Sequence, residues 1–241
     1  LPERPFHETR RTIEEDLGDD LEDLFDHFDP KPIATASIAT VHRALLHDGR
    51  EVAVKVQHRG IDMIIRQDLD NAMVITESIV EEDPKFDFRS ILREWCNETT
   101  KELDFVQEAY NTETVRRKLL CDTTVVTTVP KVIQTERIFP TTRVLVLEFI
   151  DGVKPTDRDA LARIGADNAE VLEAISVAFA RQIFVDGLFN ADPHPGNLLV
   201  DRHSKHPVLL DFGFTKEVPR ESRLSFARLL KENPGLRPTA W

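Results

Sequence analysis

Two polar turns, each next to a short apolar run, constrain this chain more than any other feature. The first turn is Asp192-Pro193-His194-Pro195-Gly196-Asn197, and the second is Asp211-Phe212-Gly213, directly after Leu209-Leu210. Proline and glycine disfavour a helix here, and neighbouring apolar residues predict strands over 198–200 and 208–210. Each motif alone is common by chance, because Asp-Pro and Pro-Gly are ordinary turn formers. Their joint occurrence in this order favours a functional site built on loops.

An Asp and an Asn five residues apart, then a strand and Asp-Phe-Gly, is the order of the catalytic and metal-binding loops of kinases. Phosphoryl transfer depends on holding the phosphate, the metal and the acceptor in line. In this interpretation Asp192 orients the acceptor hydroxyl. Asn197 and Asp211 would each supply an oxygen to Mg²⁺, a hard cation that prefers such ligands. His194 has no partner histidine at ligand spacing, so we interpret it as a loop residue.

A lysine lies on an apolar strand upstream of these loops. The predicted strand Glu51–Val56 follows the turn signal His47-Asp48-Gly49-Arg50 and places valines at alternate positions on one face. Lys55 points to the other face, as does the phosphate-pairing lysine of kinases. The alternative is an ordinary surface lysine on an edge strand. Its position upstream of the Asp and Asn residues favours the first interpretation.

A lysine in a closed cleft needs an acid to hold it, usually from a helix. The sequence predicts a helix over 88–119 that carries five acids between residues 94 and 108: Glu94, Glu98, Glu102, Asp104 and Glu108. Asp104 and Glu108 are four residues apart and share a helix face, whereas Glu102 points elsewhere. These acids therefore cannot all have one role, and solvation is the default for Glu94 and Glu98.

The order of the elements predicts an α+β fold. Helical periodicity or composition covers 8–28, 61–82, 88–119 and 157–186, and β-forming residues cover 51–56, 123–132, 143–150, 198–200 and 208–210. This order fits a kinase-like two-lobe fold, with a small lobe of antiparallel sheet and inserted helices before a partial helical large lobe. The predicted domains are an N-terminal helical segment over 1–29, the N-lobe over 30–150, a partial C-lobe over 151–220 and a truncated tail over 221–241. Turn residues in 234–241 indicate a frayed or foreign end.

Composition excludes several classes of protein. The 241 residues carry a net charge of −12 and no basic stripe, so a nucleic-acid partner is not expected. The two cysteines form no CxxC motif, so neither a disulfide framework nor a zinc site is expected. No apolar run reaches the ~18 residues of a membrane span, and no targeting segment is expected at the start.

The segment before the lysine strand contains no glycine. Ordinary kinases cover the phosphates with a glycine-rich loop, whereas residues 33–42 here read Ile-Ala-Thr-Ala-Ser-Ile-Ala-Thr-Val-His. Cβ atoms at these positions restrict the approach of the backbone to a phosphate. An ordinary protein kinase therefore fits poorly, and no activation segment with Ala-Pro-Glu is present.

Taken together, these motifs resemble the UbiB/ADCK family of atypical kinase-like proteins, which is tied to coenzyme Q metabolism. The resemblance covers about residues 1–220. It is carried by an alanine-rich loop, a lysine strand, an acidic motif and the two polar turns: Lys31–Ser37 with Val41–Ala44, Val52–Gln57, Glu102–Asp104 with Glu108 and Asn111, Asn190–Asn197, and Asp211–Gly213. The run through Asn197 is the most specific of these.

The resemblance implies a site for ATP or ADP with Mg²⁺. In it, Lys55 contacts the α- and β-phosphates and pairs with Glu108, while Glu102 and Asp104 form the family's acidic motif near the acceptor. The residues implied to surround the nucleotide are Ala34, Thr35, Ala36 and Ser37 over the phosphates, and Glu148, Phe149 and Ile150 at the adenine hinge. The implied function is an atypical kinase or ATPase acting on a small or lipid-like acceptor in support of ubiquinone biosynthesis.

The resemblance also implies a set of partners, and the sequence differs from the family pattern at several positions. A lipid or quinone-precursor ligand, biosynthetic-complex proteins, peripheral membrane association and a mitochondrial or plastid location are expected from it alone. Thr35, Thr40 and Asn190 stand where the family usually has Ala, Gln and His, and the N-terminal Lys-x-Gly-Gln helix is absent. Only a partial helical lobe is expected after Gly213. A catalytically weak nucleotide-binding regulatory module and a protein serine/threonine kinase stay as alternatives.

Overall fold

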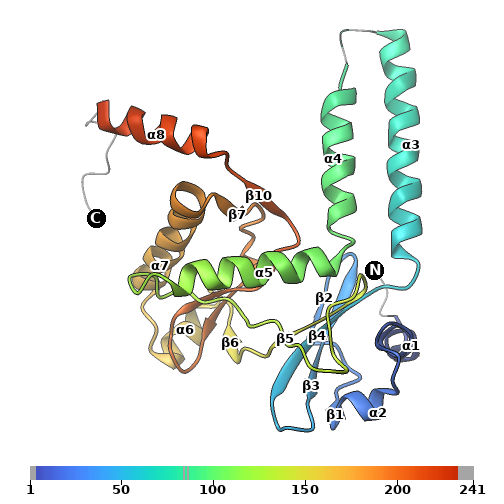
Figure 1. The fold of residues 1–241 in the computed structure, drawn as a ribbon, viewed down its shortest axis with the longest axis vertical. Helices are drawn as coiled ribbons and strands as arrows, with labels where there is room; N and C mark the ends of the chain where they lie inside the picture. The colour runs from blue at the N-terminus through green and yellow to red at the C-terminus, as the bar shows by residue number, and fades with distance from the viewer. Residues whose placement is uncertain (1–3, 84, 86, 233–241) are drawn as a thin grey trace. The chain divides into compact units, whose positions relative to one another are not determined.

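The computed structural model describes residues 4–83, 85 and 87–232 (Figure 1). The chain forms two compact units. The first consists of Leu1–Asn111 and Pro130–Ile150, and the second of Thr112–Val129 and Asp151–Trp241. Both combine helices with antiparallel strands, so the α+β class predicted from the sequence is confirmed. The predicted domain limits at 29, 150 and 220 stay predictions.

A five-stranded antiparallel sheet forms the centre of the first unit. Its strands run in the order β1-β3-β4-β5, with β2 paired to β3. They are β1 (His27–Phe28), β2 (Ala34–Thr35), β3 (Ala39–Leu45), β4 (Glu51–Gln57) and β5 (Val144–Glu148). The predicted hairpin between β3 and β4 is confirmed, and Gly49 in its turn has a φ of 84°, which favours glycine.

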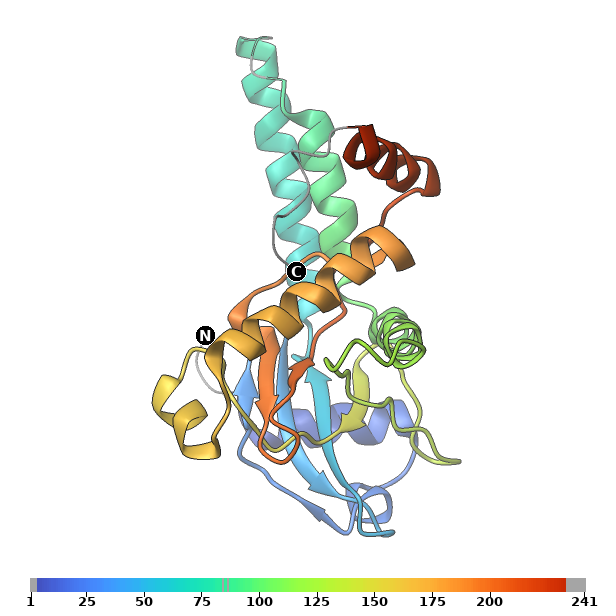
Figure 2. The ribbon, with the colours of Figure 1, turned by 90° about the vertical axis from the view of Figure 1, so that its left-hand side faces the viewer.

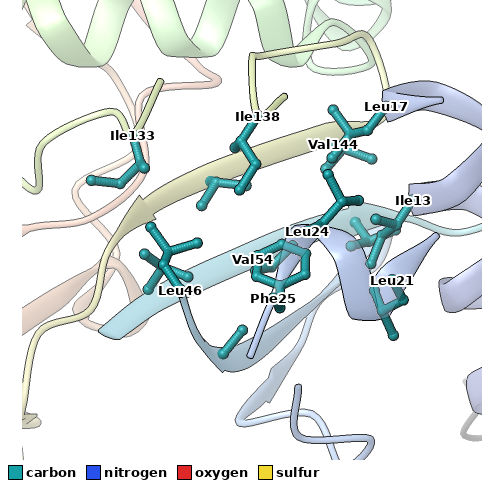
Figure 3. Close-up of a cluster of buried hydrophobic side chains, with 14 residues drawn as sticks. Ile13, Leu17, Leu21, Leu24, Phe25, Leu46, Val54, Ile133, Ile138 and Val144 are labelled. Carbon is teal, nitrogen blue, oxygen red and sulfur yellow. The ribbon is translucent and has the colours of Figure 1, made fainter. Parts of the chain in front are cut away.

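The valine face of β4 packs into the hydrophobic core of this unit. Val52, Val54 and Val56 are no more than 1% exposed. The helices α1 (Phe6–Leu17) and α2 (Leu21–Leu24) contribute leucine and isoleucine side chains to the same cluster (Figure 3). Because successive strand residues alternate between faces, this packing directs Lys55 to the other side of the sheet.

The predicted single helix over 8–28 is wrong beyond Leu17. Gly18 adopts a left-handed conformation with a φ of 81°, and its N–H bonds to Glu14 O at 2.9 Å. A glycine in this conformation ends a helix. The leucines that continued the helical spacing belong instead to the short helix α2.

Two long helices form a hairpin on the first unit (Figures 1 and 2). The helix α3 (Ile61–Glu82) has the predicted bounds, and α4 (Arg89–Lys101) packs beside it. The predicted helix over 88–119 is wrong as a single element, because α4 ends before α5 (Phe105–Leu120) begins. Asp104 causes the break: its Oδ1 accepts hydrogen bonds from the N–H groups of Val106 at 2.9 Å and Gln107 at 3.4 Å, as an N-cap does.

The described residues of the second unit form two small antiparallel sheets, the end of α5 from Thr112 onward, and three further α-helices. Its sheets are β6-β8-β9 and β7-β10. The elements are β6 (Gly152–Val153), α6 (Arg158–Ile164), α7 (Asn168–Ala180), a π-helix (Arg181–Asp186), β7 (Leu188–Asn190), a 3₁₀ turn (Pro195–Asn197), β8 (Leu198–Asp201), β9 (Pro207–Leu209), β10 (Thr215–Glu217) and α8 (Arg220–Glu232). The predicted strands at 198–200 and 208–210 are confirmed within one residue.

Other predicted elements of this unit differ from the structure. The helix over 157–186 is interrupted because Gly165, with a φ of 70°, ends α6, and the Asp167 carboxylate caps α7. The strand over 123–132 is wrong, because only isolated bridges form at Thr128 and Val132. Residues 220–232 form α8, whereas the end predicted to be frayed, 234–241, lies outside the described residues. None of the described helices is long and apolar enough to cross a membrane.

Replacing Gly152 by alanine is expected to destabilise the second unit. An added Cβ would lie 2.9 Å from Leu199 Cβ and 3.0 Å from the carbonyl oxygen of Val200. Gly152 lies in β6, which pairs with β8, so the two strands must separate to accommodate it. Overpacking of this kind costs about 1–3 kcal/mol. Urea unfolding measures the change, and an unaltered free energy of unfolding would contradict it.

Candidate functional site

A buried ion pair joins the strand β4 to the helix α5. The Lys55 Nζ donates to both carboxylate oxygens of Glu108, at 2.6 and 2.8 Å. The side chains are only 12% and 3% exposed. The Lys55 ammonium also lies 4.9 Å from the ring centre of Phe105, where a cation is attracted to the ring face. The structure therefore brings together the lysine and the acid that the family resemblance pairs.

Glu102 and Asp104, which the resemblance assigns to an acidic motif, lie between α4 and α5. Glu102 follows the last residue of α4, and Asp104 precedes α5 as its cap. The prediction that Asp104 and Glu108 share one helix face is wrong, because Asp104 lies outside the helix. Asp104 instead lines a polar cavity of about 1260 Å³ at the base of the α3–α4 hairpin. Asp104 of the acidic motif therefore lines this cavity, whereas Glu108 pairs with Lys55.

The alanine-rich loop is an exposed edge of the sheet in the first unit. Ala34 and Thr35 form β2, opposite Val41 and Thr40 of β3. The turn closes through a bond of 2.8 Å from Ala36 N–H to Ala39 O. Ala34, Thr35, Ala36 and Ser37 are all exposed, so their backbone and small side chains are accessible to a ligand.

The side chain of His58 contacts the backbone of this loop. The Nε2 of His58 lies 3.2 Å from Ala36 O. Burial lowers the pKa of His58 from its ordinary value, against a smaller opposing effect of this bond. A group whose pKa is lowered by folding contributes stability at any pH above its pKa in the unfolded chain. That contribution is lost as the pH falls through the lower pKa of the folded state. The support is therefore given by neutral His58 and weakens in acid.

The predicted hinge residues follow the end of β5. Glu148 is the last residue of that strand, and its Oε2 accepts a bond of 3.2 Å from Lys131 N–H. Phe149 N–H donates to Glu51 O at 3.3 Å. The guanidinium of Arg43 lies 4.5 Å from the centre of the Phe149 ring. These contacts tie the segment through Ile150 to the sheet that carries Lys55.

The catalytic loop predicted from the sequence lies in the second unit. The Nδ2 group of Asn197 donates to Asp192 Oδ2 at 3.0 Å. His194 is a loop residue, as predicted, since its Nδ1 accepts from Gly196 N–H at 3.0 Å. The amide orientation leaves the Oδ1 oxygen of Asn197 as the atom that can bind a cation.

The Asp-Phe-Gly triplet lies beside this loop. Leu210 N–H donates to Asn197 O at 3.0 Å, and the Asp211 Oδ1 accepts from Gly213 N–H at 2.8 Å. Phe212 is fully buried in the core of the unit, which fixes the triplet in place. The structure therefore brings together Asp192, Asn197 and the loop of Asp211 within the second unit.

Sequence reasoning assigned no positioning role to Asn190, which is 3% exposed. Its Oδ1 accepts from Asp192 N–H at 2.8 Å, and its Nδ2 donates to Asp211 O. Its own N–H donates to Oε1 of Gln182, a fully buried residue of the π-helix, at 3.2 Å. One amide therefore connects the loops of Asp192 and Asp211. The only signal in the sequence was that Asn190 departs from the family pattern.

The donor set fits magnesium better than a transition metal. Asn197 and Asp211 offer an amide oxygen and a carboxylate, and Mg²⁺ is usually held by one or two such protein groups together with phosphate and water. Across the described residues, no group of three or more His, Cys, Asp or Glu side chains could hold a metal ion. The side chains of Asn197 and Asp211 therefore have the chemistry that could hold Mg²⁺.

Residues 1–233 match the model of the ABC1 atypical kinase-like domain. The chain belongs to this family. The sequence-based resemblance to atypical kinase-like proteins is thereby confirmed. This member of the family has two sets of candidate site residues. One set is Lys55 with Glu108 in the first unit, and the other is Asp192, Asn197 and Asp211 in the second.

Curated relatives include proteins named as kinases. AarF domain-containing protein kinase 1 of Mus musculus is 36% identical over 232 residues, which cover 95% of this chain and 43% of the relative. The probable serine/threonine-protein kinase abkD of Dictyostelium discoideum is 36% identical over 235 residues, covering 95% of this chain and 33% of the relative. The chain thus spans less than half of the length of these two relatives.

A solved structure has the same fold. The Rv3197 protein of Mycobacterium tuberculosis, solved in complex with erythromycin, superposes with a TM-score of 0.73 at 27% identity. The match covers 98% of this chain and 58% of the Rv3197 chain. The kinase-like α+β fold predicted from the sequence is therefore confirmed.

Proposed function

We propose that this protein binds ATP or ADP with Mg²⁺ and acts as an atypical kinase or ATPase. The observation that carries the proposal is the buried pair of Lys55 and Glu108. Burying two charges costs desolvation energy that their attraction repays only in a favourable geometry, so such a pair is weak evidence for stability. A charged pair on the face of β4 opposite the valine core is instead typical of a functional site.

Each residue then has a defined task. Lys55, held by Glu108, contacts the α- and β-phosphates, and the loop from Ala34 to Ser37 covers them. Asp192 orients the acceptor hydroxyl, and Asn197 and Asp211 hold Mg²⁺. The bound cation neutralises charge that develops on the phosphate oxygens.

The acceptor is proposed to be small or lipid-like, in support of ubiquinone biosynthesis. The absence of glycine from the alanine-rich loop supports a departure from ordinary protein kinases. A quinone precursor, peripheral membrane association, a mitochondrial or plastid location and contacts with biosynthetic-complex proteins belong to the same proposal. They follow from the family resemblance.

A nucleotide-binding regulatory module is the second candidate. One observation favours it: the Asp192 carboxylate accepts a bond of 3.0 Å from Asn197. An aspartate held in this way is less available to an acceptor hydroxyl. Such a module would bind nucleotide without turnover.

Thermal unfolding and phosphate release distinguish the two candidates. Mg-ATP is expected to raise the free energy of unfolding by about 2.7 kcal/mol at a hundredfold excess over its Kd. We expect Asp211→Asn to lose most of this effect, because a metal ligand is removed. Asp192→Asn should keep the stabilisation and lose phosphate release. Stabilisation by Mg-ATP with no phosphate release above background, in the unaltered protein as in Asp192→Asn, would favour the module. No effect of nucleotide on the unaltered protein would contradict both candidates.

A further inference from the structure

A second polar side chain shares the functional face of β4. Residues two apart in a strand point to the same side of the sheet, so Gln57 lies on the face that carries Lys55. The valines between and before them are buried on the other face. Gln57 itself is 4% exposed. A buried amide on this face has to satisfy its hydrogen-bonding groups within the protein.

Both hydrogens of the Gln57 amide donate to backbone carbonyls. The Nε2 atom lies 2.8 Å from Leu103 O and 3.0 Å from Thr142 O. The backbone N–H of Gln57 also donates, to Arg143 O at 2.9 Å. Gln57 therefore connects three segments that are far apart in the sequence: the end of β4, the link between α4 and α5, and the approach to β5.

Leu103 occupies the middle of the link from which α5 begins. The next residue, Asp104, caps the helix, and Phe105 N–H donates to the same Thr142 carbonyl at 3.3 Å. Leu103 is only 7% exposed and Phe105 is fully buried. The start of α5 is thus fixed to the sheet at both carbonyls that Gln57 contacts. Glu108 follows one turn later on the same helix.

We propose that Gln57 is a positioning residue that fixes the first turn of α5 and thereby places Glu108 against Lys55. The role in nucleotide binding rests on the function proposed above, but the positioning itself does not. Gln57 and Lys55 thus hold α5 from one strand at two places, before its first turn and at Glu108, and they add to the bond from Phe105 N–H to Thr142 O.

The chemistry of the site requires a glutamine. Two carbonyl oxygens need two donor hydrogens on a neutral group, and an amide supplies them. Glutamate offers no donor when ionised and would place a charge beside two acceptors. Methionine has a similar length and no strong donor, so Gln57→Met removes the hydrogen bonds with little change in volume.

Hydrogen exchange of the nucleotide-free protein tests the positioning. Gln57→Met is expected to raise amide exchange in the first turn of α5 by about tenfold, the effect of losing roughly 1.4 kcal/mol of local stability. The matched control is Gln134→Met, because Gln134 is an exposed glutamine of the same unit, and it should leave that turn unchanged. Equal protection of α5 in Gln57→Met and the unaltered protein would overturn the proposal.

A double-mutant cycle separates positioning of Glu108 from general support of the fold. If Gln57 acts through Glu108, the unfolding free energies of Gln57→Met and Glu108→Gln are coupled. Additive effects would overturn the inference, whether or not nucleotide binds. In the phosphate-release assay, Gln57→Met should raise the KM for Mg-ATP more than it lowers kcat, because the lysine that contacts the nucleotide is less well held. An unaltered protein without phosphate release would count against the proposed function and leave the exchange result standing.

Discussion

Glu108→Ala is expected to destabilise the first unit by about 3–5 kcal/mol, the usual cost of removing one partner of a buried ion pair. The Lys55 side chain is only 12% exposed, so water can compensate only in part for the carboxylate that accepts its two bonds. We also expect phosphate release to fall by at least about 100-fold, because a misplaced cation no longer stabilises charge on the phosphates.

A second variant distinguishes stability from function. In Lys55→Met with Glu108→Leu, apolar side chains replace both charges, and such replacements are often neutral or stabilising. The double variant should therefore regain much of the lost free energy of unfolding while phosphate release stays lost. Urea unfolding and phosphate release measure the two quantities on the same samples. Recovery of phosphate release together with stability would show that the pair is only structural.

Local patterns predicted the strands and helices whose signals lie within a few residues. The alternation around Val54 predicted β4 and the direction of Lys55, and α3 was predicted from its first to its last residue. The break at Asp104 was missed because an N-capping aspartate has the same spacing to Glu108 as an acid on a continuous helix. The Thr- and Val-rich segment 123–132 has the composition of a strand without forming one, because β-propensity does not reveal whether a partner strand lies alongside.

The residues of the candidate site likewise fall into those that the sequence predicted and those that it did not. The order of Asp192, Asn197 and Asp211 was visible in the sequence, whereas the choice of Glu108 needed the family resemblance. The buried amides were not predicted, because the contacts of Gln57 with residues 103 and 142 depend on tertiary structure. Glutamine and asparagine are ordinary surface residues by composition. Only the structure, in which Gln57 and Asn190 are buried, reveals that their amides bind backbone N–H and carbonyl groups.

Asn190 provides the second large effect. Its side chain accepts from Asp192 N–H at 2.8 Å and donates to Asp211 O. Asn190→Leu removes both bonds and leaves two backbone groups without this partner, which costs about 1–3 kcal/mol for each group that stays unsatisfied. Phosphate release should fall by about 100-fold, because a shift of the catalytic groups by even 1 Å can have that effect.

The variant Asn190→Asp distinguishes the effects of the two hydrogen bonds of the Asn190 side chain. Its carboxylate can still accept from Asp192 N–H, but it faces the Asp211 carbonyl with an acceptor where the amide had a donor. The loop of Asp211 should therefore move, and the Mg²⁺ concentration that gives half-maximal phosphate release should rise about tenfold, a loss of roughly 1.4 kcal/mol. The matched control is Asn168→Asp, the same chemical change at an exposed residue of the second unit. Because only the bond to Asp211 is reversed, an unaltered Mg²⁺ requirement in Asn190→Asp would mean that Asn190 does not set the position of the metal loop.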